Sequence, residues 1–404
     1  MRWNVDRTND LIVVNGLVFD GESAELADAA VRIVDGRIVE VGGQAGPDSQ
    51  VIDARGSVVL PGLIDAHFHA YGNSLSMSET EGRPLSFTAL KGAQRLGAAL
   101  RRGFTTVRDV AGGDRGLALA IEQGLLDSPR YFYTGAALSQ TGGHGDSRSA
   151  EQLGCACDGQ TCEVVDGVDD LRRAVRERLR TGAHAIKIMA SGGVVSLTDP
   201  IRIPQYSVEE ITAVCAEADR RGSYVAAHAY SPEAIRHAVG CGVRSVEHGN
   251  LLDAPTAAFL AERDAFLVPT LATYAAMAEY GGRVGMTPIQ LAKNAEVLDN
   301  GREAIALAYA AGVPVGFGTD LMGDLESEQL SGLRLQAEAS DVLATLRAAT
   351  TVNAALLRRD DLGRIGIGAV GDLLIPGGNP FDDPAVLWTS GEHRVVIQGG
   401  RVVA

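Results

Sequence analysis

The middle of the chain alternates short apolar runs with segments of helical periodicity, and this alternation constrains the fold more than any other feature. Eight runs read as strands, at residues 62–69, 104–110, 130–138, 185–189, 223–229, 244–250, 265–271 and 313–320. Helical patterns lie between them, as where Leu171, Val175 and Leu179 share one face. Eight strand–helix units over about 300 residues predict a (β/α)8 TIM barrel. A doubly wound open sheet is the alternative, but no GxGxxG sequence follows the first run.

The two ends of the chain read differently from the middle. The first sixty residues alternate apolar and polar positions and carry turn signals such as Asn15-Gly16 and Asp35-Gly36. The same alternation returns after residue 366. We therefore predict a small β-sandwich domain formed from both termini, residues 1–60 and 367–404, around a barrel domain at 61–366.

Composition excludes several classes of protein. The 404 residues are 46% hydrophobic and carry a net charge of −15, so the chain can bury a large core but lacks a basic footprint for nucleic acid. No apolar run reaches the roughly 18 residues of a membrane span. The first residues lack the basic start and long apolar core of a signal peptide. We expect a soluble, cytoplasmic protein with neither nucleic acid nor membrane as a partner.

Six residues capable of binding metal fall near the C-terminal ends of the predicted barrel strands, where barrel enzymes place their chemistry. They are His67, His69, Lys187, His228, His248 and Asp320. Because side chains at positions i and i+2 of a strand share one face, both imidazoles of the His-Phe-His sequence can point into the barrel mouth.

Each of these residues has a structural alternative when taken alone. A single histidine in an apolar strand is more often a core residue, and Asp320 after Gly-Thr could cap a helix. A lysine in an apolar strand, such as Lys187, usually pairs with an acid because burying its charge is costly. The joint placement on five strands favours a metal site, and nitrogen and oxygen ligands suit Zn²⁺ or a similar ion.

These motifs resemble the amidohydrolase superfamily, and the resemblance covers nearly the whole chain. It rests on the PGLIDAHFH sequence at 61–69, the strand lysine, the two later histidines and the Gly-Thr-Asp ending at Asp320. The resemblance implies two divalent metal ions, zinc in our expectation, bridged by a carboxylated Lys187. It also implies that His67, His69 and Asp320 hold one ion and that His228 and His248 hold the other. A buried lysine has a lowered pKa, so its neutral amine can take up CO₂ to give the carbamate.

Longer phrases narrow the resemblance to one branch of the superfamily. LSQTGGHGD (138–146), IKIMASGGV (186–194) and AAHAY (226–230) are similar to prolidase-like and Xaa-Arg/Lys dipeptidases and carboxypeptidases. This implies hydrolysis of the amide bond of a dipeptide or N-acyl amino acid with a free carboxylate. Two metal ions would lower the pKa of a bridging water and supply hydroxide. Asp320 would carry the proton to the leaving amine. Members of the family are often oligomeric, so we expect a homo-oligomer.

Three further features belong to the loops. By the same resemblance, His144 and Tyr230 are candidate catalytic residues that contact the substrate carboxylate or stabilise the reacting oxygen, although both could simply pack in loops. Arg202 is either a carboxylate partner or an exposed side chain. The remaining feature is a cysteine cluster, which we predict to be free thiols rather than a metal site or disulfide: Cys155, Cys157 and Cys162.

Rival functions remain open. A cyclic amide hydrolase or lactonase of the same fold would use the same ligands. A mononuclear deaminase would not need Lys187 and would need a general acid near His228, where the sequence offers only Glu233. A metal-loaded scaffold without activity is the non-enzymatic alternative. Two equivalents of metal favour the amide hydrolase, and one favours the deaminase.

Overall fold

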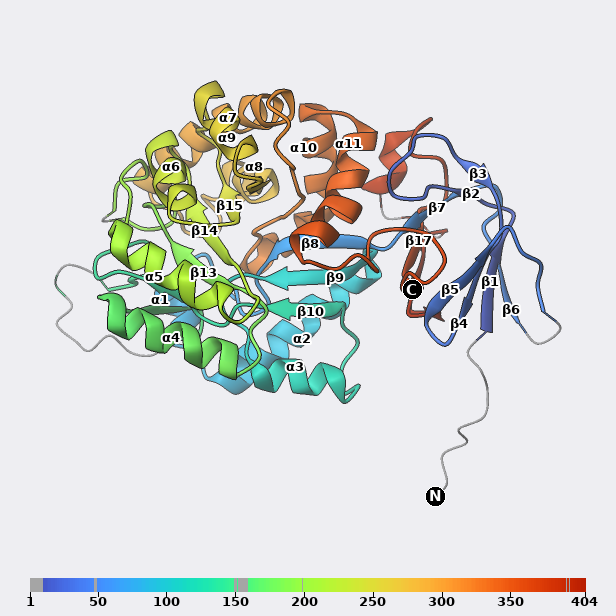
Figure 1. Ribbon diagram of the computed structural model, residues 1–404, viewed down its shortest axis with the longest axis horizontal. Coiled ribbons are helices and arrows are strands. Elements are labelled where there is room, and N and C mark those ends of the chain that lie inside the picture. Colours follow the sequence, from blue (N-terminus) through green and yellow to red (C-terminus); the bar gives the residue numbers. More distant parts are fainter. Residues whose placement is uncertain are drawn as a thin grey trace, which may run out of the picture. The chain divides into compact units, whose positions relative to one another are not determined.

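The structure, a computed structural model, describes residues 10–46, 49–148, 151, 159–197, 199–389, 391 and 393–404 (Figure 1). The chain divides into two compact units. The first contains Met1–Ile64, Ala98–Thr106 and Asp341–Ala404, and the second contains Asp65–Gly97 and Val107–Ser340. The domain boundaries after residues 60 and 366 stay a prediction.

The first unit is built mainly from two β-sheets. One has the order β5-β4-β1-β6, with β1 (Asp10–Val14), β4 (Val31–Val34), β5 (Arg37–Val41) and β6 (Gln50–Asp53). The other has the order β19-β18-β17-β7-β2-β3. Its strands are β2 (Leu17–Val18), β3 (Ala27–Asp28), β7 (Val58–Pro61), β17 (Leu373–Ile375), β18 (Val395–Gln398) and β19 (Arg401–Val402).

Segments from the two ends of the sequence share this second sheet. Leu373 of β17 pairs antiparallel with Pro61 of β7. Side chains from both sheets, among them Leu11, Val59 and Ile397, are fully buried in one apolar cluster. The unit also holds the short helices α11 (Val342–Arg347) and α12 (Asn353–Leu356).

The second unit is α/β, with parallel strands, as the sequence predicts. Its six-stranded sheet has the order β12-β11-β13-β14-β15-β16. These strands are β11 (Ala137–Ser139), β12 (Cys162–Val164), β13 (Ile186–Met189), β14 (Val225–Ala229), β15 (Ser245–His248) and β16 (Phe266–Val268). A three-stranded sheet has the order β10-β9-β8, with β8 (Leu63–Phe68), β9 (Phe104–Asp109) and β10 (Arg130–Tyr133).

Helices follow most of these strands. They are α1 (Met77–Glu81), α2 (Leu85–Arg101), α3 (Arg115–Glu122), α4 (Val168–Arg180), α5 (Val208–Asp219), α6 (Pro232–Gly240), α7 (Ala254–Ala261), α8 (Leu271–Tyr280), α9 (Pro288–Ala310) and α10 (Ser331–Ala339). Figure 1 shows α4, α5 and α6 on the outside of strands β13 and β14. Ser207 begins α5 with a capping box closed by Glu210, and Thr287 begins α9 in the same way with Gln290. Each box satisfies two backbone donors at the helix start.

Strands β13, β14 and β15 of the parallel sheet are buried along their whole length, as expected when helices cover a sheet. The register places Met189 beside His228 and Ala229 beside His248. Parallel strands end at one edge, so this register brings their last residues together. The third predicted run is divided between β10 and β11. The eighth run forms only an isolated bridge, from Val315 to Leu267.

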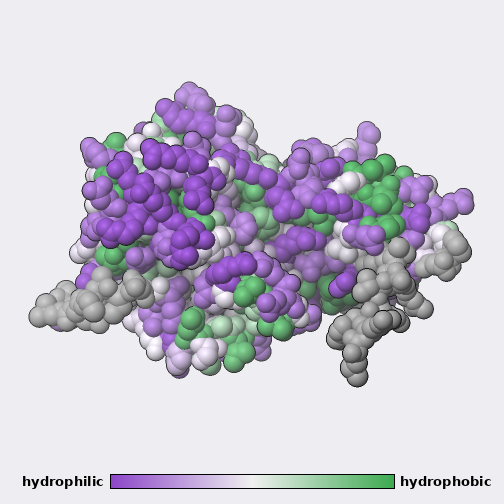
Figure 2. Space-filling model, turned by 60° about the horizontal axis from the view of Figure 1, so that its bottom comes forward, coloured by the Kyte–Doolittle hydropathy of each residue, from purple (hydrophilic) through white to green (hydrophobic). Residues whose placement is uncertain are grey.

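Figure 2 shows one face of the molecule, most of which is hydrophilic, with smaller apolar patches between. This agrees with the net charge of −15. Among the described residues, no helix has the length and apolar character needed to cross a lipid bilayer.

Candidate active site

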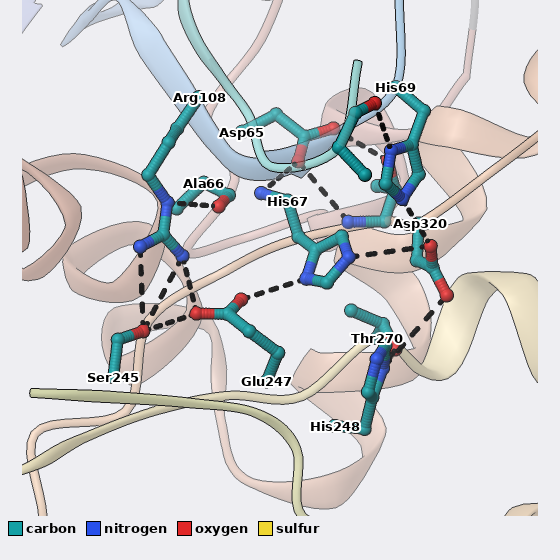
Figure 3. Close-up of polar contacts among 12 residues, drawn as sticks. Asp65, Ala66, His67, His69, Arg108, Ser245, Glu247, His248, Thr270 and Asp320 are labelled. Atoms are coloured by element: carbon teal, nitrogen blue, oxygen red, sulfur yellow. Dashed lines mark hydrogen bonds and ion pairs between the residues drawn. The ribbon is translucent and has the colours of Figure 1, made fainter. Parts of the chain in front are cut away.

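His67 of β8 and His69, the residue that follows the strand, lie side by side and face one carboxylate. His67 and His69 are both buried, and their ring centroids are 5.2 Å apart. The Nε2 atom of His69 lies 2.8 Å from Oδ1 of Asp320, and Nε2 of His67 lies 3.4 Å from the same oxygen (Figure 3). Gly318 permits this approach, because a Cβ there would lie 2.5 Å from the Cβ of His67.

His248 and Asp320 both adopt the left-handed backbone conformation, with φ of 77° and 54°. This conformation is uncommon for residues other than glycine, and it often marks functional sites. The two side chains approach each other, with His248 Nδ1 3.9 Å from Asp320 Oδ2. Ligand atoms of His67, His248 and Asp320 lie within 4.8 Å of one another, so these three buried residues could hold a metal ion.

His228 and Lys187 complete the group of predicted ligands. The His228 ring lies 4.5 Å from the His248 ring, centroid to centroid. Lys187 of β13 is 2% exposed, and within the described residues its amine has neither a hydrogen bond nor an ion pair. Burial lowers its pKa to about 8, against the opposing effect of Glu247 and Asp320. All six predicted ligands line a single cavity.

Each of the four histidines has a hydrogen-bond partner at one ring nitrogen, and in His248 this nitrogen is also the one that faces Asp320. The contacts are His67 Nδ1 to Glu247 Oε2 (2.8 Å), His69 Nδ1 to the Ala111 carbonyl (3.3 Å), His228 Nε2 to the Gly192 carbonyl (3.1 Å) and His248 Nδ1 to Thr270 Oγ1 (2.7 Å). A neutral imidazole held in this way presents the lone pair of its other nitrogen, which is the form that binds metal.

The protonation states agree with a cation site. Burial lowers the pKa of His228 and of His248 well below the usual value, so both are neutral at pH 7. Burial opposes ionisation of Asp320, but His67 and His69 outweigh it and hold the Asp320 pKa well below its ordinary range. Burial opposes protonation of His69, but its hydrogen bond to Asp320 outweighs this and raises the His69 pKa, and a bound metal ion would replace that proton. Two neutral histidines, an ionised carboxylate and a buried lysine that has no hydrogen bond or ion pair among the described residues fit a site for divalent metal ions.

A second buried carboxylate joins the segments that carry His67 and Asp320. Asp65 accepts hydrogen bonds from the backbone N–H of His67 (3.1 Å), from Thr319 Oγ1 (2.6 Å) and from Gln329 Nε2 (2.9 Å). Asp65 was not among the residues predicted from the sequence. Its only signal there was an acidic residue inside an otherwise apolar strand.

His144 lies over the cavity, as predicted for a residue of the mouth. It is buried, lines the cavity and donates to or accepts from Ser196 Oγ at 2.8 Å through Nδ1. Asp199 Oδ2 lies 3.7 Å from the same nitrogen. Burial lowers the pKa of His144, partly against the effect of Asp199. Only glycine fits at Gly193, because a Cβ there would lie 2.0 Å from His144 Cε1.

Lys293 of α9 fixes the loop that carries these contacts. Its Nζ atom donates to the carbonyl oxygens of Gly193 (3.0 Å), Ser196 (2.8 Å) and Asp199 (2.9 Å). Nothing in the local sequence indicates this role, because the lysine and the loop are about 100 residues apart.

Tyr230 lies behind the histidines rather than in the cavity. It is 2% exposed, its hydroxyl is 2.7 Å from the hydroxyl of Tyr274, and it is absent from the described residues that line the cavity. Its ring stacks on His248 at 5.1 Å. A catalytic role for Tyr230 stays a prediction. Of the two roles considered for Arg202, the structure shows the exposed side chain. Its guanidinium pairs with Glu296 at 2.6 Å on the surface.

The cysteine cluster is only partly visible. Cys155 and Cys157 lie outside the described residues. Cys162 is a free, buried thiol that lines the cavity, and burial raises its pKa to about 12. The apolar part of the cavity wall includes four methionines and two valines, namely Met77, Met189, Met277, Met322, Val194 and Val195.

Comparison with known proteins identifies the family. Residues 58–403 match the Amidohydrolase family. Ochratoxinase from Aspergillus niger is 32% identical over 338 residues, which cover 78% of this chain and 70% of the relative.

Two solved structures are similar over nearly their full length. A prolidase complexed with N-methylphosphonate-L-proline is 44% identical, with a TM-score of 0.94, covering 97% of this chain and 99% of that one. A Xaa-Pro dipeptidase with bound methionine is 30% identical, with a TM-score of 0.87, covering 97% of this chain and 99% of that one. The resemblance noted in the sequence is therefore confirmed, and the chain belongs to the amidohydrolase family.

Proposed function

We propose that the protein is a metal-dependent hydrolase that cleaves the amide bond of a dipeptide or N-acyl amino acid with a free carboxylate. The observation that carries this proposal is the cavity lined by all six predicted metal ligands, which are His67, His69, Lys187, His228, His248 and Asp320. The similarity to a prolidase, a Xaa-Pro dipeptidase and an ochratoxinase supports it.

In this proposal His67, His69 and Asp320 hold one metal ion, and His228 and His248 hold a second. The neutral amine of Lys187 would add to CO₂ and lose a proton, and the resulting carbamate would be a ligand for both ions. Its amine fits that role because it is buried without a partner among the described residues and its pKa is lowered to about 8. Two divalent ions, zinc in our proposal, would polarise the amide carbonyl and make water a stronger acid.

Residues of the chain would carry out proton transfer and hold the substrate. Asp320 is ionised at neutral pH, so its carboxylate can accept a proton from the attacking water and deliver it to the leaving amine. His144, fixed by Ser196 and the Lys293 loop, lies where it can contact the substrate carboxylate or the oxygen on which charge develops. A carboxylate held in this way would orient the amide for attack.

The cavity wall favours an apolar group on the substrate. Methionine side chains are flexible and polarisable, so they adapt to apolar groups of different shape. Four of them line this cavity. We therefore propose an apolar side chain or acyl group on the side of the scissile bond away from the carboxylate.

We further propose that the two sheets of the second unit are arcs of one closed (β/α)8 barrel. Backbone bonds support this: Ala66 N–H donates to the Phe317 carbonyl and Gly316 N–H to the Leu267 carbonyl. Residues 313–320 thus lie between β16 and β8, where the eighth strand of a barrel belongs. The two sheets of the first unit share an apolar cluster, which supports the proposed β-sandwich from both termini.

A substrate screen tests the proposal. The protein, supplied with Zn²⁺, is incubated with a library of dipeptides and N-acyl amino acids, and released amine is measured. We expect cleavage of substrates with an apolar residue or acyl group and a free carboxylate, and much slower cleavage of the matched C-terminal amides. Equal cleavage of acid and amide would contradict carboxylate recognition. Activity confined to lactones, cyclic amides or aminated bases would favour the rival functions.

A further inference from the structure

A fully buried charged pair lies directly behind one of the proposed metal ligands. Glu247 of β15 and Arg108 of β9 are 0% and 1% exposed. Neither residue is one of the six predicted ligands. Figure 3 shows them joined in a chain that runs from Ser245 through Glu247 to His67.

The two oxygens of Glu247 have different partners. Oε1 accepts from Arg108 Nη2 at 2.7 Å and from the Ser245 hydroxyl. Oε2 faces Nδ1 of His67 at 2.8 Å. Arg108 is itself fixed, since its Nε donates to the Ala66 carbonyl at 2.6 Å. The carboxylate is therefore held in one orientation by groups that do not belong to the cavity.

Strand geometry explains how Glu247 and His248 can both serve the site. Alternation along β15 places Ser245 and Glu247 on one face and would direct His248 to the other. The left-handed conformation of His248 at the strand end changes the direction of its side chain. The two adjacent residues therefore contact different parts of the site. His248 faces Asp320 as a proposed ligand, and Glu247 contacts the Nδ1 side of His67.

Among the four histidines, His67 alone has a carboxylate as its outer partner within the described residues. The corresponding partners of His69, His228 and His248 are two backbone carbonyls and the hydroxyls of Thr270 and Tyr274. An ionised carboxylate can only accept a hydrogen bond, so Nδ1 of His67 carries the proton and donates it in that bond. The lone pair of His67 is then on Nε2, the nitrogen that faces Asp320. The carboxylate also makes the imidazole a stronger ligand than a neutral acceptor would.

We propose that Glu247 is a positioning residue that holds His67 in the Nδ1–H tautomer, and that Arg108 fixes the position and orientation of this carboxylate. The inference rests on the proposed metal-dependent function. The competing explanation is that Glu247 and Arg108 form only a structural ion pair of the strand interior. A structural pair would affect the stability of the metal-free protein without changing its affinity for metal.

The experiment compares three variants of the full chain. Glu247→Gln removes the charge, and its amide group can present either an oxygen or an N–H to His67. The double variant Arg108→Gln/Glu247→Gln also removes the buried charge that the single variant leaves unpaired. The matched control is Glu217→Gln, because Glu217 is a buried carboxylate of α5 that pairs with Arg176 at 2.8 Å outside the cavity.

Two quantities are measured for each protein after removal of metal. Zn²⁺ affinity is obtained by competition with a chromophoric chelator, and the urea midpoint of unfolding is obtained without metal. We expect Glu247→Gln to weaken Zn²⁺ binding about 10- to 100-fold. The double variant should recover part of the urea midpoint while its Zn²⁺ affinity stays low. Glu217→Gln should lower the midpoint and keep the affinity of the unaltered protein.

Two results would overturn the inference while leaving the proposed function intact. One is unchanged Zn²⁺ affinity in Glu247→Gln, and the other is full recovery of affinity in the double variant. If the unaltered protein binds no Zn²⁺, both the inference and the proposed function are wrong, so the two failures are distinguishable. If Glu247→Gln does not fold, the Zn²⁺ affinity of the double variant distinguishes a positioning role from a purely structural ion pair.

Discussion

His144 lies flat against His228, with ring centroids 4.3 Å apart and ring planes at 22°. One of these imidazoles is a proposed metal ligand, and the other is held by the loop that Lys293 fixes. The stack therefore places a second imidazole at the edge of the proposed metal site without making it a ligand. In the proposed function, His228 binds metal and the stacked His144 contacts the substrate, so the two roles belong to different residues.

The first prediction follows from that separation. His144→Gln should lower kcat/KM by about 10²-fold, because a donor aimed at the substrate is lost. The metal content should stay unchanged, since His228 keeps its own partner at Gly192. Steady-state kinetics and metal analysis check both statements, with the exposed His393→Gln as the control. Loss of metal in His144→Gln would show that His144 is needed for the metal site itself.

The second prediction concerns Asp320. Asp320→Asn should lower turnover by roughly 10²- to 10⁴-fold, because an amide cannot accept and deliver the proton. Substrate binding should be largely kept, as measured by inhibition or by calorimetry with a non-hydrolysed analogue. Near-normal turnover with full metal occupancy would reject the proton-transfer role.

The third prediction concerns Lys187. Lys187→Ala should lose most bound metal, because the proposed carbamate is the group that joins the two ions. Short carboxylic acids such as acetate should restore part of the metal content and activity. Metal analysis with and without acetate checks this, and Lys91→Ala on the exposed face of α2 is the control. A protein that binds two ions beside an unmodified Lys187 amine would contradict the proposal.

The fourth prediction is a pH dependence of stability. Burial raises the pKa of Cys162 to about 12, from an ordinary value of 9.0. Between these values the folded protein keeps a proton that the unfolded chain releases, so the free energy of unfolding falls as the pH rises. The thiol contributes up to about 1.4 kcal/mol per pH unit in this window.

Urea unfolding of the metal-free protein at several pH values above about pH 9 measures this effect. Other buried groups contribute to the slope, so the comparison is with Cys162→Ala, whose stability should fall less steeply with pH. Parallel slopes for the two proteins would show that Cys162 titrates normally.

Much of the proposed site could be predicted because it follows strand geometry. The spacing of His67 and His69 sets both on one side at the end of β8, and the parallel register brings His228 and His248 to the same sheet edge. A lysine among apolar residues stands out in the sequence, so Lys187 could be singled out without the structure.

The residues that were missed depend on contacts that no local pattern reveals. Glu247 is adjacent to His248, and strand alternation alone would set the two on opposite faces. The left-handed conformation of His248 is a consequence of packing at the strand end, not of a glycine that the sequence would show. Asp65 and Lys293 act through partners about 250 and 100 residues away.

Loop residues were the least predictable. Tyr230 follows a strand that leads to the cavity, but its hydroxyl turns to Tyr274, whose position depends on how α8 packs. Arg202 could be placed in neither role from the sequence, because Glu296, its partner, lies on α9. In both cases the partner lies on a helix far away in the sequence, α8 for Tyr230 and α9 for Arg202, so the sequence around each residue does not predict its contact.

We propose above all that amide hydrolysis depends on metal bound by His67, His69, Lys187, His228, His248 and Asp320. A metal titration tests this most directly. The protein is stripped with a chelator and titrated with Zn²⁺, and amine release from the best substrate of the screen is measured against equivalents of metal. We predict no activity without metal and a rise that levels off at two equivalents. Full activity in the stripped protein, or a plateau at one equivalent, would contradict the account.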